Sequence, residues 1–122
     1  MANKTGLTSS FSVTSPYVSG NNYQLAQDRF NNTNASIFFN SGYVEVPSGI
    51  YFDGTDFTII MWVKTTQVFW QSLLDFGNTN ITNNVIFQLD SSIRPNFEIT
   101  VGTSKKWYFS STPLVLNEWN HM

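Results

Sequence analysis

Acidic residues that could do chemistry are few and scattered in this chain of 122 residues. Hydrolysis of a glycosidic bond needs two carboxylates that converge on the bond. Two acids would share one face of an expected strand if they alternated along it, and no two acids have that spacing. The eight acids are Asp28, Glu45, Asp53, Asp56, Asp75, Asp90, Glu98 and Glu118. Glu45 and Glu98 each stand alone on an expected strand, where we interpret them as outward-facing polar residues. We therefore expect no glycosidase activity.

Nucleophilic and cofactor-dependent chemistry also lacks its residues. His121 is the only histidine and the penultimate residue, where we expect no rigid shell that could orient it in a Ser-His-Asp site. Cysteine is absent, which removes disulfides, thiolate metal sites and thiol nucleophiles. No serine lies in a G-x-S-x-G elbow, and no phosphate-binding loop or dinucleotide fingerprint occurs. The sequence therefore predicts that the protein is not an enzyme.

A pair of carboxylates near a tight turn forms the candidate metal site. Asp53 and Asp56 flank Gly54 and Thr55, and hard oxygen ligands of this kind suit calcium. The alternative is a plain Asp-Gly turn followed by an acid at the start of a strand. That alternative is favoured because the chain lacks the full ligand series of an EF-hand loop. Calcium is the candidate cofactor, with Asp53 and Asp56 as its candidate ligands.

Aromatic side chains are the candidates for ligand contact. The chain has eleven Phe, five Tyr and four Trp, and glycan binding uses aromatic platforms flanked by hydrogen-bonding groups. Phe69 and Trp70 stand out because they lie in the connection between Thr65 and Gln71 and not in a clear strand. Tyr51, Trp107 and Tyr108 are weaker candidates. Packing of Phe69 and Trp70 over a sandwich edge is an equally good interpretation, since large aromatic residues are usually buried.

The composition predicts one folded domain without a basic surface. Hydrophobic residues make up 41% and charged residues 11% of the chain, which is too apolar for a disordered segment. A net charge of −2 and a pI near 5.0 give no electrostatic footprint for nucleic acid. The one adjacent basic pair, Lys105 and Lys106, is interpreted as a solvated hairpin end. No apolar run has transmembrane length and no signal peptide is present, so we expect no membrane insertion and export only within a longer chain.

Short apolar segments separated by turn residues predict an all-β fold. No stretch keeps a helical period, so helix is expected for at most a turn or two near Leu25–Arg29. Residues 57–64 carry large apolar groups on both faces and are predicted to form a central strand covered on each side. Residues 85–89 and 97–101 are predicted to pair. The other expected strands are residues 35–39, closed by a turn at 40–42, and then residues 43–46, 72–76 and 107–109. Residues 1–22 are interpreted as a linker rich in Ser, Thr and Asn or as a weak first strand.

Five segments, taken together and in order, resemble the laminin-G-like, concanavalin-A-like jelly-roll family. They are residues 28–40 (DRFNNTNASIFFN), 43–47 (YVEVP), 57–64 (FTIIMWVK), 72–77 (SLLDFG) and 112–121 (TPLVLNEWNH). The resemblance implies an antiparallel two-sheet sandwich, with Trp62 and Trp119 packed in the core and His121 in a structural role. It also implies recognition of a glycan or a protein outside the cell, often with calcium, by one module of a multidomain chain.

The resemblance further predicts that the sandwich, over residues 23–122, is incomplete. The family's strands after the Trp119-x-His121 motif have no counterpart in this sequence. Open strand edges are then expected, and strands such as residues 85–89 carry no charge that would discourage pairing. The first hypothesis is a non-catalytic recognition module, extracellular or at the cell surface, that binds a glycan or an extracellular protein. The alternative is a structural or adhesive module that forms homo-oligomers through its open edges.

Overall fold

The computed structural model describes residues 19–46, 51–52, 56–77 and 82–122, and the regular elements in these ranges are all strands. In chain order they are β1 (Ser19–Ala26), β2 (Ser36–Glu45), β3 (Trp62–Val63), β4 (Gln71–Phe76), β5 (Val85–Leu89), β6 (Pro95–Val101), β7 (Ser104–Phe109) and β8 (Asn120–His121). Every strand pair is antiparallel, which confirms the predicted all-β class. The described ranges contain no helix long and apolar enough to cross a membrane.

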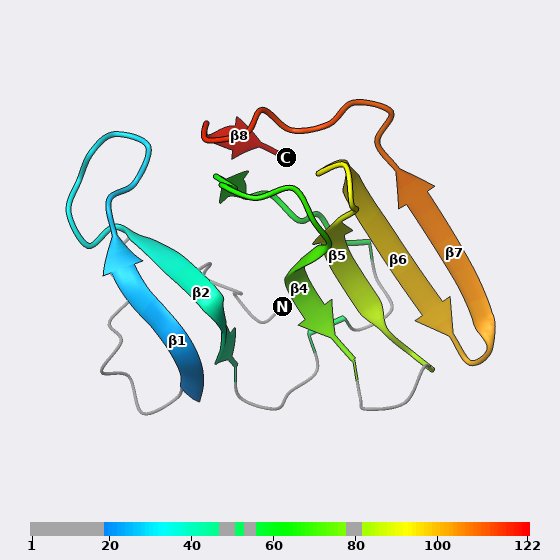
Figure 1. Cartoon of the computed structure of the whole chain (residues 1–122). Coiled ribbons are helices and arrows are strands. Elements are labelled where there is room, and N and C mark those ends of the chain that lie inside the picture. The colour runs from blue at the N-terminus through cyan, green and yellow to red at the C-terminus, as the bar shows by residue number, and fades with distance from the viewer. Residues whose placement is uncertain (1–18, 47–50, 53–55, 78–81) are drawn as a thin grey trace. The chain divides into compact units, whose positions relative to one another are not determined.

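The strands fall into two compact units, residues 1–57 and 58–122. The first unit contains the β1–β2 hairpin. The second contains the pair β3–β8 and a four-stranded sheet in the order β4-β5-β6-β7 (Figure 1). Each strand of the four-stranded sheet thus pairs with its neighbour in the sequence, which makes the sheet a meander built from consecutive hairpins.

The turn between β5 and β6 is held by one carboxylate. Asp90 Oδ1 accepts hydrogen bonds from the backbone N–H groups of Ser92 (2.8 Å) and Arg94 (2.9 Å). Its Oδ2 lies 2.7 Å from a guanidinium nitrogen of Arg94. Ile93 has φ 53°, a conformation that is unfavourable for a β-branched residue, and its N–H donates to the Asp90 carbonyl oxygen (2.9 Å). These contacts close the turn in one geometry and so set which residues of β5 and β6 face each other.

Strands β5 and β6 pair as the sequence predicts. Val85 lies opposite Ile99, and Phe87 lies opposite Phe97. Because residues that are opposite in an antiparallel pair share one side of the sheet, these four side chains form part of an apolar face. The Phe87 and Phe97 rings meet edge to face, with 6.2 Å between their centroids. The predicted pairing of residues 85–89 with the strand that contains residues 97–101 is confirmed.

A two-residue loop sets the position of β7. Val101 lies opposite Ser104, so Gly102 and Thr103 alone make the turn. Gly102 has φ 58°, which glycine adopts without strain at the first position of such a loop. Its N–H donates a 2.8 Å hydrogen bond to Asn83 Oδ1. The loop therefore fixes which side chains of β7 lie on each face of the sheet.

Strand β2 continues through residues 40–42, so the turn predicted there is wrong. At this point the register of the hairpin shifts, and three residues of β2 lie opposite Asn22 of β1. The result is a β-bulge, in which Ser41 has φ 52°. Gly42 is required because a Cβ atom at this position would overlap the carbonyl oxygens of Asn21 and Asn22. The turn-forming residues bend the strand instead of ending it, because β1 supplies a partner on both sides of them.

Residues 57–64 do not form the central strand that the sequence predicts. Within the described ranges only β3 is a strand there, and its partner is β8. Met61 and Met122 extend the pair by exchanging two backbone hydrogen bonds (3.1 and 3.0 Å). A strand needs N–H and C=O partners along its length, and β8 together with Met122 supplies them only to residues 61–63. Trp62 is 44% exposed, so its predicted place in a core is also wrong, and its ring lies 4.8 Å from that of His121.

The open edges of the four-stranded sheet differ from the prediction. Residues 85–89, offered by the sequence as an example of an uncharged edge, form β5, which lies between β4 and β6. A strand without charges suits this inner place, since both of its sides are hydrogen-bonded. Among the described residues, β4 and β7 are the edges of the sheet.

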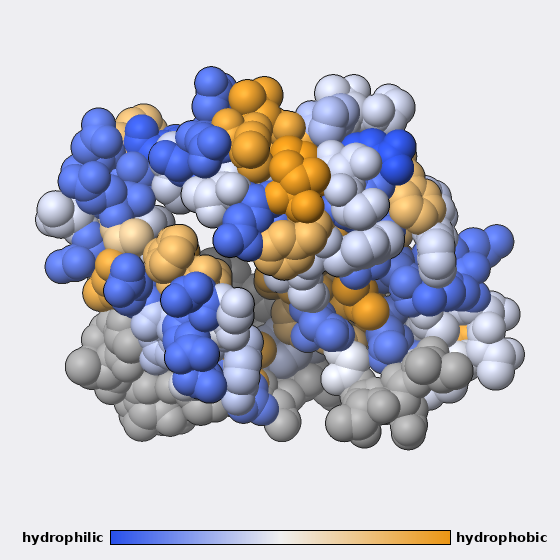
Figure 2. Space-filling view, in the orientation of Figure 1, coloured by the Kyte–Doolittle hydropathy of each residue, from blue (hydrophilic) through white to orange (hydrophobic). Residues whose placement is uncertain are grey.

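Polar side chains take a large share of the buried positions. In the described ranges, Leu89 and Ile93 are the buried apolar residues. Figure 2 shows hydrophobic residues at the surface beside hydrophilic ones. The buried polar residues are Thr65, Asp90, Asn96, Glu98 and Thr100. Because a buried polar group is stable only when it is hydrogen-bonded, hydrogen bonds and ion pairs carry much of the order in residues 58–122.

The Asp90 turn gives the protein a predictable response to acid. Hydrogen bonds from the backbone N–H and then the side chain of Arg94 hold the pKa of the Asp90 carboxyl below its usual value. A lowered pKa in the folded state means that the stability contributed by Asp90 is present above the unfolded pKa of about 3.9. That stability is lost as the pH falls through the lower pKa of the folded state.

We predict that Asp90→Asn lowers the melting temperature at neutral pH, because the amide cannot form the ion pair with Arg94. The difference from the natural sequence should shrink as the pH falls below the unfolded pKa and through the lower pKa of the folded state, where Asp90 loses its charge in the natural protein as well. Thermal melting followed by circular dichroism across this pH range measures the effect. Glu118→Gln, the same charge change at an exposed residue, is the control and should leave the melting temperature nearly unchanged. A difference that stays constant with pH would contradict the role of the Asp90 charge.

Candidate functional site

The second face of the four-stranded sheet carries polar residues from all four strands. Its register places side chains in rows across the sheet, and we call this surface the polar face. One row is Asp75, Ile86, Glu98 and Trp107; the next is Ser72, Gln88, Asn96 and Phe109; and Thr100 and Lys105 begin a third. Carboxylate, amide, hydroxyl and ammonium groups thus lie beside two aromatic rings on one surface.

Glu98 is the centre of the polar face. Its side chain is 8% exposed, so its charge needs a partner. Lys105 Nζ lies 2.8 Å from Glu98 Oε1, and the Thr100 hydroxyl donates to the same oxygen at 3.2 Å. The ammonium group also lies 4.5 Å from the centre of the Trp107 ring, which is within the range of a cation–π contact. Lys105 therefore holds a buried carboxylate and an exposed ring in one cluster.

The two rings of the polar face are held in place but not covered. The Trp107 and Phe109 side chains are each 50% exposed, and their ring centroids are 5.6 Å apart. The Lys105 ammonium group also lies over the indole. An indole that contacts two neighbours while half of the residue stays exposed can stack on a flat apolar surface of a ligand without first rearranging.

Unpaired amide oxygens lie in the same part of the sheet. Within the described residues, Oδ1 of Asn96 and Oδ1 of Asn84 are buried without a hydrogen-bond donor. Asn96 belongs to the polar face, and the Asn84 carbonyl oxygen accepts the backbone N–H of Thr100 at 2.8 Å. A buried acceptor without a donor costs about 1–3 kcal/mol. These two amides thus have hydrogen-bonding capacity that the folded chain does not use.

Phe69 and Trp70, the first predicted ligand residues, lie in the connection between β3 and β4. They are 49% and 53% exposed. The connection is ordered by Gln71, whose side-chain N–H group donates to the carbonyl oxygens of Gln67 (2.9 Å) and Phe69 (3.3 Å). The buried Thr65 hydroxyl donates to Gln71 Oε1 at 2.9 Å. The structure therefore presents both rings at the surface of a hydrogen-bonded loop, and their contact with a ligand stays a prediction.

Tyr108, the third predicted ligand residue, does not share a face with Trp107. It lies opposite Phe97, so it belongs to the apolar face of the sheet, and it is 61% exposed. Neighbouring residues of a strand point to opposite sides. The structure therefore separates Tyr108 from the polar face, and its role as a ligand contact also stays a prediction.

The predicted calcium ligands are only partly described. Asp53 lies outside the described residues, and Asp56 is exposed. Within the described ranges no three His, Cys, Asp or Glu side chains cluster as metal ligands would. The prediction of calcium at Asp53 and Asp56 thus rests on the sequence.

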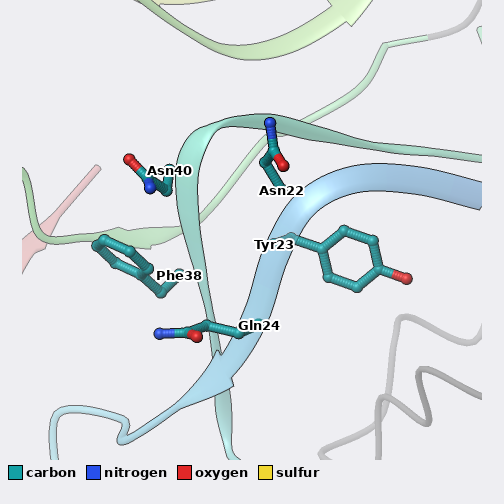
Figure 3. A pocket seen from close by; sticks show the side chains of 5 residues that line it. All are labelled: Asn22, Tyr23, Gln24, Phe38 and Asn40. Carbon is teal, nitrogen blue, oxygen red and sulfur yellow. The ribbon is translucent and has the colours of Figure 1, made fainter.

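A small cavity lies in the β1–β2 hairpin next to the bulge. Its volume is about 230 Å³, and it is lined by Asn22, Tyr23, Gln24, Phe38 and Asn40. In Figure 3 the Tyr23 ring points to the opposite side of the hairpin from the Phe38 ring. The cavity is smaller than the roughly 300–1,000 Å³ of most small-molecule sites, so we do not place the functional site there.

The sequence reading missed Glu98 and Lys105. It interpreted Glu98 as outward-facing, which is wrong because the residue is 6% exposed. It interpreted Lys105 as part of a solvated hairpin end. Counting outward from the two-residue turn would have found the cluster, because Val101 opposite Ser104 places Glu98 opposite Trp107.

Comparison with known proteins gives one family match. A laminin-G-type family model, described as the concanavalin A-like lectin/glucanases superfamily, matches residues 38–122. Neither a curated protein nor a solved structure matches the chain. The matched range includes all four strands of the sheet that carries the polar face.

The Glu98–Lys105 pair predicts an asymmetric effect on stability. We expect Lys105→Met to cost about 1–3 kcal/mol, because it leaves a buried carboxylate without its cation. Glu98→Gln should cost less, since the Lys105 side chain is 45% exposed and water can solvate its charge. The double variant should recover part of the Lys105→Met loss. Urea denaturation of all three variants gives the comparison, and equal costs for the two single changes would argue against a buried charge at Glu98.

Proposed function

Because the chain belongs to the concanavalin A-like lectin/glucanases superfamily, we propose that it is a non-catalytic recognition module that binds a glycan on its polar face. Membership confirms the predicted fold class, an antiparallel β-sandwich of the jelly-roll type, and domains of the laminin G type are typically binding modules. Fold alone does not determine a ligand. The choice of a glycan therefore rests on the residues of the polar face.

The exposed Trp107 ring beside the Glu98–Lys105 pair is the observation that supports a glycan. A sugar ring has an apolar C–H surface and a rim of hydroxyl groups, so it suits an indole face surrounded by hydrogen-bonding groups. Lys105, whose side chain is 45% exposed, offers N–H donors next to the indole. A flat apolar ligand would leave these polar groups unpaired, which costs binding energy.

The arrangement of acids on the sheet supports binding without catalysis. Asp75 and Glu98 are the acids on its four strands, and they share a row of the polar face with β5 between them. Two strand spacings are about 9.5 Å, at the far limit for the carboxylates of an inverting glycosidase. Glu98 Oε1 is already engaged by Lys105 and Thr100. We therefore propose no hydrolytic role for this pair.

A place outside the cell is part of the same proposal. Glycans that a module can meet are abundant on secreted and surface proteins, and a chain without cysteine remains usable in an oxidising environment because no thiol can be oxidised. The partner is then a glycan carried by an extracellular molecule. Binding to a protein surface that survives removal of its glycans would instead support the protein partner that the sequence left open.

Trp107→Ala should reduce glycan affinity at least about tenfold, because it removes the stacking surface. Tyr108→Ala is the matched control, since it removes an aromatic ring of similar exposure from the same strand but from the opposite face. A glycan array identifies the ligand, and calorimetric titration of the natural chain and both variants then gives the affinities. The site would lie elsewhere if Trp107→Ala still bound the glycan and another variant did not. The informative variants are Tyr108→Ala and the double variant Phe69→Ala with Trp70→Ala. Turnover of a chromogenic glycoside would overturn the non-catalytic proposal.

We also propose that calcium assists the module through Asp53 and Asp56. A cation that binds only the folded chain must raise its melting temperature, so calorimetry in calcium and then in chelator should show a higher transition with calcium. Asp56→Asn should remove the shift, and Glu118→Gln, a matched charge change at another exposed acid, should keep it. A melting temperature indifferent to calcium would exclude the metal and leave the glycan proposal intact.

A further inference from the structure

Among the described strands, none pairs with the outer side of β7, which is a hydrogen-bonding edge of the sheet. In the described residues β7 has β6 on one side and no strand on the other, and Figure 1 shows it at the margin of the sheet. The backbone N–H of Ser110, just after β7, donates to Pro95 of β6 at 2.8 Å. Since backbone groups alternate in direction along a strand, Tyr108 and Lys106 also direct theirs to β6. Lys105, Trp107 and Phe109 therefore direct their N–H and C=O groups outward.

The side chains of β7 do not protect this edge. All six residues of the strand are exposed, and three of them are the aromatic residues Trp107, Tyr108 and Phe109. Lysines on an edge usually discourage pairing with another strand. Here the charge of Lys105 is balanced within the chain by Glu98, so one of the two lysines opposes association only weakly.

We propose that β7 pairs antiparallel with β7 of a second copy of this chain, with Trp107 opposite Trp107 across a two-fold axis. Only residues that direct their backbone groups outward can form the hydrogen-bonded pairs of the new ladder. With the axis at Trp107, Lys105 lies opposite Phe109 of the second copy and Phe109 opposite its Lys105. All three outward residues are then used, which gives about six hydrogen bonds between the copies.

The side chains favour the same register. Centred on Trp107, it sets Lys105 against Phe109 and Lys106 against Tyr108, so each lysine faces an aromatic ring, where a cation–π contact can form. A register centred on Lys106 would place its two copies directly opposite, and like charges there are destabilising. It would also use fewer outward groups. The β7 sequence is therefore self-complementary in one register.

The other edge of the sheet is less suited to association. Strand β4 contains a bulge between Ser72 and Leu74, and a bulge at an edge disrupts the regular spacing that a new ladder needs. A β4–β7 contact would also leave each copy with one free edge, so it would add chains without closing. The β7–β7 contact closes as a dimer. It places the polar faces of both copies on the same side of one continuous sheet, because the two-fold axis is perpendicular to that sheet.

Single cysteines test the register directly, because the natural chain has none. In the proposed dimer the two Cα atoms at position 107 are about 5.5 Å apart, within the roughly 4.4–6.8 Å that a disulfide spans. Trp107→Cys should form a covalent dimer under mild oxidation of the full chain, whereas Lys105→Cys should not, since its copies are about 14 Å apart. Lys106→Cys tests the alternative register centred on Lys106, in which the two copies of residue 106 would lie opposite each other and cross-link. Cross-linking at 105 or 106 in preference to 107 would overturn the proposal.

A charge series tests the contact without removing Trp107. Phe109→Glu places an acid opposite Lys105 of the other copy, and Phe109→Lys places a lysine there, while both remove the same ring. The dissociation constant of the dimer should differ by about tenfold between them, with the glutamate variant tighter. Sedimentation equilibrium of the full-length chains measures it, and circular dichroism checks that both fold. A natural chain that stays monomeric at all concentrations, or two variants with equal constants, would refute the pairing.

Discussion

The Asp90 carboxylate holds the turn on which the organisation of residues 58–122 depends. Its bonds to Ser92 and Arg94 close the loop between β5 and β6, even though Ile93 must take an unfavourable backbone conformation. A shift of one residue in that loop would move every side chain of β6 to the other side of the sheet. Glu98 would then share a side with the apolar rings of β5, and Phe97 would lie on the side of Gln88. The contacts of Asp90 thus maintain the separation between an apolar face and a polar face.

The polar face differs from an ordinary solvated surface in the burial of its central residues. Asn96, Glu98 and Thr100 of β6 are more buried than Phe97 and Ile99 on the other side of the same strand. A carboxylate in such a place needs both its cation and its hydroxyl partner, and these partners also fix the indole beside it. Preorganisation of this kind lowers the entropy cost of binding, because the side chains that meet a ligand are already ordered. The family provides the scaffold, and the arrangement of these residues provides the selectivity.

The sequence predicted what depends on local alternation. The pairing of residues 85–89 with 97–101 followed from apolar residues at every second position, and the structure has that pairing. It failed at residues 40–42, because turn-forming residues become a bulge when a partner strand lies on both sides of them. The prediction of a strand over residues 57–64 was wrong, because the hydrophobicity of a segment does not determine how many of its residues find a partner strand. Prediction of the candidate site would have required the register of β6 and β7 across the Gly102 turn. That register places Trp107 on the polar face and Tyr108 on the apolar face.

The meander order of β4 to β7 has a consequence for the way the chain folds. Every contact between neighbouring strands in that sheet joins segments that are close in the sequence, so loop closure costs little entropy and hairpins can form one after another. The pair β3–β8 is the opposite case, because Trp62 and His121 come from distant parts of the chain and share a short ladder. The sheet should therefore be complete in the folding transition state, whereas the β3–β8 contact forms late and opens first when the native chain fluctuates.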